Sequence, residues 1–498
     1  MSSTKKKAVA VIGGGVSGLV ATKIFKERGH EVTSFERSHD IGGVWEISRS
    51  YPDVQTQSPK DLYCYTDHPM PDDYPEWPKG TQVHEYLHDY AIKHDLMKNY
   101  RLNCNILKMT KTMFGKGGWV LTIESNGKTT SEFFQFVVVC TGQFSDKKMV
   151  SFPGEDRFKR KGGMIMHSSE YTNSSIIKAK KIVVLGGSKS ATDIAVNAMK
   201  NGALSTTMVY RKNVWRAPYK IGGINFKHLL YMRMQENQFN SWDKRLSTKF
   251  LSTVTAPFVW ANFRALETLL NAQLGLDKLG MLPDTKIEDD ANCSLAIATP
   301  GFFEALKEEK LKAVKSSFGH YDDGKVVLEN GDEIDADVVI LATGWHLGVP
   351  FLQREYQDKL IDEEDGLYRL YRLSVNPDIP DMGFVGFNSS FCTVLSAEMI
   401  ANWLVRYADN QLAVMPSVEE MNENIEMMMD WKRNERPAAR VYGGLCSAPF
   451  HFKHFDELLT DMGAKKNKSN NFVAEHFSYP CAKAYGEFLK SCPQYMAS

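Results

Sequence analysis

Residues 8–18 read AVAVIGGGVSG, a short apolar run followed at once by a glycine-rich segment. The run predicts a buried strand, and the pattern Gly13-x-Gly15-x-x-Gly18 predicts a tight turn into a helix that continues to about Arg28. Gly13 permits the turn, Gly15 lets a pyrophosphate approach the backbone, and Gly18 lets the helix pack closely on the strand. Phosphates bind at the N-terminus of such a helix. The stretch therefore predicts a dinucleotide-binding fold.

An acidic residue follows the next predicted strand, Glu31–Phe35. Glu36 stands where a carboxylate can accept hydrogen bonds from ribose hydroxyls. Just beyond, residues 40–45 read DIGGVW. This segment either brings backbone amides and Trp45 toward a flavin or is a structural turn with a core tryptophan.

The same pattern occurs a second time. Residues 181–185 form an apolar run before GGSKSA at 186–191, in which Ser188 replaces the middle glycine and Ala191 the last. Alanine still allows close helix packing, and the hydroxyls of Ser188 and Ser190 could donate to phosphate. A second dinucleotide site is therefore predicted.

Each copy continues to a hairpin with an Asn-Gly turn, which is a strong hairpin signal. In the first copy residues 119–123 pair with 133–139, and in the second residues 325–328 turn toward 338–341. Both hairpins lead into an apolar strand that ends in Thr-Gly, at Gly142 and at Gly344.

The residues that end the two equivalent strands carry opposite charges. Glu36 ends the strand of the first copy, whereas Arg211 and Lys212 follow residues 206–210 of the second. An acid would repel a 2′-phosphate and an arginine would pair with it, so the second site is expected to prefer NADPH. The alternative is a solvated Arg-Lys turn without a ligand.

Composition indicates an ordinary globular protein of two or three compact units. The 498 residues include 60 Lys and Arg against 60 Asp and Glu, with 43% hydrophobic residues, so we expect no nucleic-acid partner. The eight cysteines include no C-x-x-C pair, which favours a reducing cytoplasm, and no metal-ligand cluster is visible. No apolar run is long enough for a membrane anchor. The sequence is compatible with a homo-oligomer.

The expected fold is α/β, with two Rossmann-like domains, one inserted in the other. We expect residues 1–172 to form the first part of an FAD domain and residues 173–330 an NADPH domain with a helical insertion at about 220–310. Residues 331–498 are expected to return and complete the first domain. Helices are predicted at 257–274 and 396–407.

With these motifs in place, the chain resembles the flavin-containing monooxygenases over nearly its whole length. The shared order is the first glycine motif, then Glu36-Arg37, then Gly42-Gly43-Val44-Trp45. The family's linker signature Phe-x-Gly-x-x-x-His-x-x-x-Tyr is matched by Gly163, His167 and Tyr171.

Two positions depart from the family's pattern. Lys161 stands where the linker signature has Phe, and Phe158 lies three residues earlier. Gln57 follows Thr56 where many members carry an Asn beside the flavin, and the extra methylene displaces the amide. Tyr171, where Baeyer–Villiger relatives have Trp, favours the branch that oxidises amines and sulfides.

The resemblance implies an NADPH-dependent FAD monooxygenase that takes O2 and a small-molecule substrate. NADPH would reduce the flavin, oxygen would add at C4a, and the hydroperoxide would oxygenate an amine nitrogen or a sulfide sulfur. The protein mainly positions and shields these groups. Gln57 is the candidate catalytic residue. The expected cofactor-binding residues are Gly13, Gly15, Ser17, Gly18, Glu36, Arg37, Gly43, Val44, Trp45, Thr56, Gln57, Tyr171, Gly186, Ser188, Ser190, Ala191, Asp193, Arg211, Lys212, Thr343 and Gly344.

Three other functions share part of this pattern. A pyridine nucleotide disulfide reductase has the same two-nucleotide layout, but it needs a redox cysteine pair. Ketone oxygenation or halide oxidation could proceed from the same hydroperoxide. A non-catalytic sensor would bind FAD or NADPH without consuming oxygen.

Overall fold

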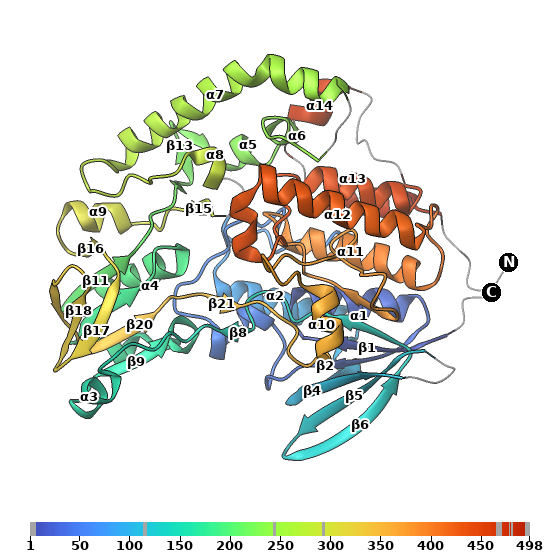
Figure 1. The fold of residues 1–498 in the computed structure, drawn as a ribbon, viewed down its shortest axis with the longest axis horizontal. Coiled ribbons are helices and arrows are strands. Elements are labelled where there is room, and N and C mark those ends of the chain that lie inside the picture. The colour runs from blue at the N-terminus through green and yellow to red at the C-terminus, as the bar shows by residue number, and fades with distance from the viewer. Residues whose placement is uncertain are drawn as a thin grey trace.

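The structure is a computed structural model that describes residues 6–112, 117–242, 246–290, 294–464, 471–477, 479 and 482–493. Two parallel sheets form the framework, with one at the lower right of Figure 1 and the other at the left. Helix α7 (Leu246–Leu274) runs along the top of the molecule in this view. The largest apolar core contains residues of both sheets, including Val11 and Val184, so the two units share one interior.

The first sheet has five parallel strands in the order β22-β7-β1-β2-β3. These strands are β1 (Ala8–Ile12), β2 (Glu31–Phe35), β3 (Tyr100–Arg101), β7 (Phe136–Val139) and β22 (Met382–Phe384). The two central strands, β1 and β7, consist almost entirely of buried apolar residues, as expected for a sheet covered on both faces. The strand order changes direction between them, which is where α/β sheets bind ligands.

The second sheet repeats this arrangement in the order β16-β11-β10-β20-β9, again all parallel. Its strands are β9 (Met164–His167), β10 (Lys181–Leu185), β11 (Ser205–Tyr210), β16 (Lys312–Lys315) and β20 (Val338–Leu341). The equivalent change of direction lies between β10 and β20. The predicted duplication of the nucleotide fold is confirmed.

The sheets divide the chain differently from the expected boundaries at 172/173 and 330/331. Strand β9 precedes the first boundary and β20 follows the second, yet both belong to the second sheet. Strand β22 pairs with β7, so the later segment does return to the first sheet. The difference arises because β9 and β20 pair with each other although all of residues 173–330 lie between them in the sequence, and no local motif reveals that pairing.

The predicted strand at 133–139 is two strands. Strand β5 (Trp119–Ser125) pairs with β6 (Lys128–Phe134) through the predicted Asn-Gly turn, and β7 begins only at Phe136. Gln135 separates them because its N–H donates to Ala8 O and its side chain accepts from Ala8 N, both at 2.9 Å. The second copy is divided in the same way, with β18 (Lys325–Leu328) pairing with β19 (Glu333–Asp335) before β20.

Helices cover both sheets. The glycine loops lead into α1 (Val16–Glu27) and α4 (Lys189–Lys200), and α1 packs against α11 (Thr393–Ala408). The predicted helices at 257–274 and 396–407 lie inside α7 and α11. Among the described helices, none combines the length and the apolar character that a membrane crossing requires.

The other helices are α2 (Gly80–Lys93), α3 (Glu155–Arg160), α5 (Lys227–Leu230), α6 (Arg233–Glu236), α8 (Ile287–Asp290), α9 (Phe302–Lys307), α10 (Arg354–Leu360), α12 (Val418–Glu435), α13 (His451–Asp461), α14 (Phe472–Phe477) and α15 (Ala482–Ser491). The other strands are β4 (Cys104–Lys111), β8 (Asp146–Lys147), β12 (Arg216–Ala217), β13 (Lys220–Ile221), β14 (Ile224–Asn225), β15 (Ala296–Ile297), β17 (Phe318–Asp322) and β21 (Trp345–His346).

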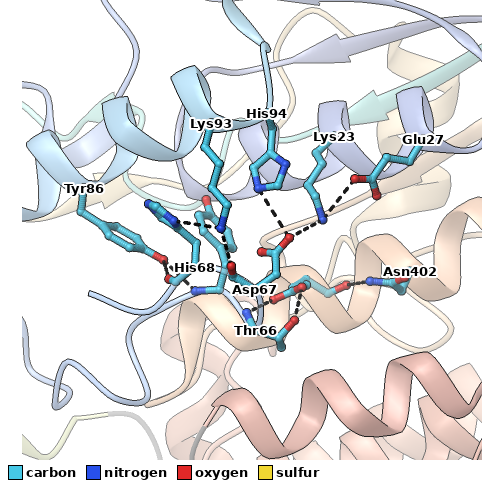
Figure 2. Close-up of polar contacts among 11 residues, drawn as sticks. Lys23, Glu27, Thr66, Asp67, His68, Tyr86, Lys93, His94 and Asn402 are labelled. Atoms are coloured by element: carbon cyan, nitrogen blue, oxygen red, sulfur yellow. Dashed lines mark hydrogen bonds and ion pairs between the residues drawn. The ribbon is translucent and has the colours of Figure 1, made fainter. Parts of the chain in front are cut away.

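A polar cluster that extends from buried Lys23 and Glu398 to exposed Asp67 joins α1 and α11 to the loop before α2 (Figure 2). Lys23 of α1 pairs with Asp67 at 2.9 Å, and His94 lies 3.5 Å from the same carboxylate. The N–H and hydroxyl of Thr66 donate to the carboxylate of Glu398 on α11, at 2.8 and 2.7 Å. Burial nevertheless raises the pKa of Glu398 to about 7.

Candidate nucleotide and catalytic sites

The first glycine loop is built so tightly that side chains would not fit at two of its positions. Gly13 has φ +120°, and a Cβ added there would lie 2.5 Å from the carbonyl oxygen of Cys140 at the end of β7. A Cβ on Gly18 would lie 1.8 Å from Gly13 O. These glycines therefore allow β1, β7 and α1 to approach one another, as the sequence motif predicted.

Gly15 has a different role. Its backbone is extended, with φ −85° and ψ −167°. It occupies the N-cap position of α1, where a glycine provides no side-chain cap. Gly43 of the DIGGVW segment approaches it so closely that a Cβ on Gly15 would lie 3.3 Å from Gly43 Cα. The two backbones thus form a shallow cradle at an uncapped helix N-terminus, which suits a pyrophosphate.

Glu36 lies at the predicted end of β2 and is buried. Its carboxylate accepts hydrogen bonds from Gly14 N at 2.6 Å and from Ser38 N at 2.8 Å. The carboxylate is therefore held across the glycine loop, where ribose hydroxyls of a bound dinucleotide would meet it. Ser17, the other polar residue of the loop, lies against Gly386 beyond β22.

Thr141 and Gln143, which both follow β7, carry buried polar atoms that have no partner among the described residues. The hydroxyl of Thr141 and both amide atoms of Gln143 are buried and have no hydrogen-bond partner among the described residues. Such orphaned groups are costly unless a ligand or water pairs with them. They stand at the change of strand direction in the first sheet, so they fit a bound cofactor. Sequence reasoning noted the Thr-Gly motif but missed Gln143, which directly follows it.

The second glycine loop repeats the geometry of the first. Gly186 has φ +149°, and its Cβ would lie 2.5 Å from the carbonyl oxygen of Ala342, the equivalent of Cys140. Ser188 occupies the N-cap position of α4 with φ −98° and ψ −171°, close to the values of Gly15. Its hydroxyl makes no capping hydrogen bond. Ala191 is fully buried. The backbone cradle thus survives with Ser and Ala in the glycine positions.

Arg211 and Lys212 directly follow β11, as Glu36 follows β2. Both side chains are exposed, and neither forms an ion pair with any residue that the structure describes. The carbonyl of Lys212 would lie 2.6 Å from a Cβ on Gly187, so these residues border the loop. Two available cations beside an uncapped helix N-terminus suit a phosphate.

Arg216 supports the same loop and was missed in the sequence. It is fully buried, and its guanidinium donates to Gly187 O and to Asn213 Oδ1. Burial lowers the pKa of Arg216 to about 10, which leaves it a cation at neutral pH. A buried positive charge under the loop adds to the attraction for phosphate.

At the start of α4, Asp193 is buried and Ser190 is half-buried. Asp193 accepts hydrogen bonds from Thr299 and Lys189, and Tyr51 donates to it at 3.0 Å. Burial and the Asp193 charge raise the pKa of Tyr51 well above its usual value, and Ser190 hydrogen-bonds the same hydroxyl. The helix that was expected to contact NADPH is therefore joined to a loop of the first unit.

A second contact between these elements involves Tyr171. Its hydroxyl donates to Asn197 Oδ1 at 2.6 Å, and Asn197 donates to Asp53 Oδ2 at 2.6 Å. Tyr171 has no exposed surface. Its polar atom is thus already used in fixing the linker to α4.

Gln57 lies where the first unit meets the helical insertion. Its side chain is exposed, and Oε1 accepts from Ile297 N at 3.2 Å. Tyr231 of the insertion donates to its backbone oxygen at 3.0 Å. No described residue accepts from its NH2 group. Thr56 is buried, and its hydroxyl donates to Ser58 O at 2.8 Å.

Of the two readings of Trp45, the structure favours the core tryptophan. The side chain is 8% exposed, and its indole N–H donates to Tyr63 at 2.8 Å with the rings edge to face. Val44 and Arg37 are exposed, and Arg37 donates to Ser145 O. The DIGGVW segment thus offers its backbone, rather than its aromatic ring, to the glycine loop.

The linker meets the late strand motif through His167. This histidine is fully buried, and Nε2 lies 3.0 Å from Gly344 O while Nδ1 lies 2.9 Å from Ser169 Oγ. Thr343 donates to Lys148 O at 2.6 Å. These contacts make His167 a structural histidine.

The departure at Lys161 has a structural explanation. Phe158 is fully buried, and a Cβ on Gly163 would lie 2.3 Å from its ring. The aromatic residue of the linker signature is thus supplied from α3, three residues early, and Lys161 only ends that helix.

Together the two loops define a protein with two Rossmann-type dinucleotide sites. Comparison with known proteins identifies its family. The Flavin-binding monooxygenase-like family matches residues 6–476. A probable flavin-containing monooxygenase 1 of Arabidopsis thaliana is 32% identical over 94% of this chain and 94% of that protein.

Solved structures share the fold. S-allyl-L-cysteine S-oxygenase from Allium sativum has a TM-score of 0.63 at 18% identity, covering 98% of this chain and 93% of that one. A cyclohexanone-bound cyclohexanone monooxygenase has a TM-score of 0.68 at 15% identity, covering 91% and 97%.

The chain belongs to the flavin-binding monooxygenase-like family. It is an oxidoreductase whose cofactors are FAD and NADPH. Family membership removes the disulfide reductase from the alternatives.

Proposed function

We propose that this chain transfers one oxygen atom from O2 to an amine nitrogen or a sulfide sulfur of a small organic molecule. FAD occupies the first glycine loop and NADPH the second. When bound, the flavin accepts a hydride from NADPH and then activates oxygen. The residues of the chain bind, orient and shield these groups.

The observation that carries the proposal is the opposite charge at two equivalent positions. The buried Glu36 carboxylate crosses the first loop, whereas exposed Arg211 and Lys212 border the second. A 2′-phosphate would be repelled at the first site and paired at the second. The side-chain atoms of Thr141 and Gln143, which have no hydrogen-bond partner in the described part of the chain, support FAD at the first site.

Gln57 is the proposed catalytic residue. Its amide oxygen accepts a hydrogen bond from Ile297 N. The NH2 group of the same amide is therefore left as a donor at the border of the helical insertion. Tyr231 fixes the backbone beneath it. In this position the amide can donate to the flavin or to a substrate.

The test is to supply NADPH and ¹⁸O2 to the FAD-loaded protein with an amine, a sulfide, a ketone or bromide. We expect NADPH consumption to rise with an amine or sulfide and one labelled oxygen to enter the product. If only the ketone or bromide is oxidised, the substrate assignment is wrong. If NADPH is consumed without any labelled product from the four substrates, the monooxygenase proposal itself fails.

A further inference from the structure

Two histidines and an aspartate converge beside the first glycine loop. His84 and His88 are one turn apart on α2, so both face the same side of the helix. Asp40 comes from the DIGGVW segment. The Nε2 atoms of His84 and His88 lie 3.3 and 3.0 Å from a single oxygen, Oδ2 of Asp40. One donor atom from each of the three residues lies within 4.8 Å of the other two.

We propose that Asp40, His84 and His88 bind a divalent transition-metal ion, with Zn²⁺ as the best match. Zinc bonds to imidazole nitrogen and carboxylate oxygen are about 2.1 Å long, which places neighbouring ligand atoms of a tetrahedron about 3.4 Å apart. The separations of 3.0 and 3.3 Å are already close to that spacing. Three protein ligands of this kind leave a fourth position for water.

The surroundings suit such a site. All three side chains are partly buried, with 11%, 31% and 26% of the side chains of His84, His88 and Asp40 exposed. The second carboxylate oxygen of Asp40 accepts from Ile41 N at 2.8 Å, which orients the ligand. His84 Nε2 also lies 3.1 Å from Ile41 O.

The ion would connect α2 to the cradle of the first nucleotide site. Gly42 has φ +125°, and a Cβ there would lie 2.7 Å from the His84 ring, so the turn and the ring are already in close contact. The next residue, Gly43, forms the cradle with Gly15. A bound ion would therefore stiffen the cradle and slow the release of its ligand. This consequence rests on the proposed placement of FAD, whereas zinc binding itself does not.

The experiment titrates the metal-stripped, FAD-loaded full chain with ZnCl2 in a calorimeter. Wild type is expected to bind one ion per chain. His88→Gln and Asp40→Asn each remove a ligand and are expected to weaken binding by at least about tenfold, since even outer-shell changes at zinc sites cost that much. His39→Gln is the matched control, because His39 precedes Asp40 but has a 66% exposed side chain that lies 3.9 Å from Glu46.

Unfolding temperature and flavin absorbance show whether each variant is folded and loaded. The proposal is overturned if wild type binds no stoichiometric zinc, or if His88→Gln and Asp40→Asn bind it as tightly as His39→Gln does. A zinc site that leaves the rate of FAD loss unchanged would overturn the stiffening alone. Failure of the oxygenation assay would leave the zinc titration unaffected.

Discussion

Replacing Gly15 with alanine should separate cofactor binding from folding. The backbone of Gly15 is extended, so alanine meets no left-handed strain, and the added Cβ would lie 3.3 Å from Gly43 Cα. The close contact is partly offset by about 0.4–1 kcal/mol from the stiffer unfolded chain. The folded protein should therefore keep a stability near that of wild type.

The same methyl group occupies the cradle where the pyrophosphate approaches the backbone. Displacing the phosphate from one amide removes a hydrogen bond to a charged group, worth about 1.5–3 kcal/mol. That loss raises the Kd for FAD about 10- to 150-fold. Ser188 already has a Cβ at the equivalent place, so the NADPH site serves as an internal reference. The KM for NADPH should not change in Gly15→Ala.

The assay is quenching of flavin fluorescence when FAD is added to the apoprotein, with thermal unfolding measured in parallel. Gly18→Ala is the contrasting variant, because its Cβ would lie 1.8 Å from Gly13 O and should destabilise the fold itself. Wild-type affinity for FAD in Gly15→Ala would refute the reasoning. A loss of FAD binding that is accompanied by a large fall in the unfolding temperature would also refute the reasoning.

Three further changes test the second site, the catalytic residue and the buried acid. Arg211→Gln should raise the KM for NADPH by about tenfold or more, because one charge-assisted hydrogen bond is worth about 1.5–3 kcal/mol. The KM for NADH should stay unchanged. Equal effects on the two nucleotides in steady-state kinetics would contradict the prediction. Gln57→Ala should keep NADPH oxidation but lower the yield of oxygenated product per NADPH, and an unchanged yield would remove Gln57 from the mechanism. Because the pKa of Glu398 is raised from 4.5 to about 7, the folded chain keeps a proton that the unfolded chain releases, and the free energy of unfolding should fall by at most about 3 kcal/mol as pH rises through that window. Denaturant unfolding at pH 5 and 8 should show this fall in wild type and a smaller one in Glu398→Gln; identical pH dependence in both would exclude the carboxyl as its source.

The parts of the fold that local patterns control could be predicted from the sequence. The glycines, the apolar strands and the charge at the strand ends all act within a few residues, and the structure has each of them in place. The break at Gln135 could not be foreseen, because it depends on pairing with Ala8 at the start of the chain. The expected boundaries at 172/173 and 330/331 left β9 and β20 outside the NADPH domain, because the pairing of these two strands is also a contact between distant parts of the chain.

The candidate site was predicted less completely, because burial and pairing are tertiary properties. Gln143 and Arg216 look like ordinary polar residues in the sequence. The structure shows that Gln143 is buried with no side-chain partner among the residues it describes, and that Arg216 is buried beneath a loop. Conversely, Trp45 and Tyr171 match the family pattern, yet Tyr63 and Asn197 already use their polar atoms.

The return of β22 to the first sheet has a consequence for biosynthesis. The second sheet has all its strands once the ribosome has made residue 341, whereas the first lacks β22 until residue 384. Domains tend to fold as units while the chain emerges. The nucleotide unit that begins second can therefore be completed first, and the first sheet, which then lacks only β22, must wait with the edge of β7 unpaired.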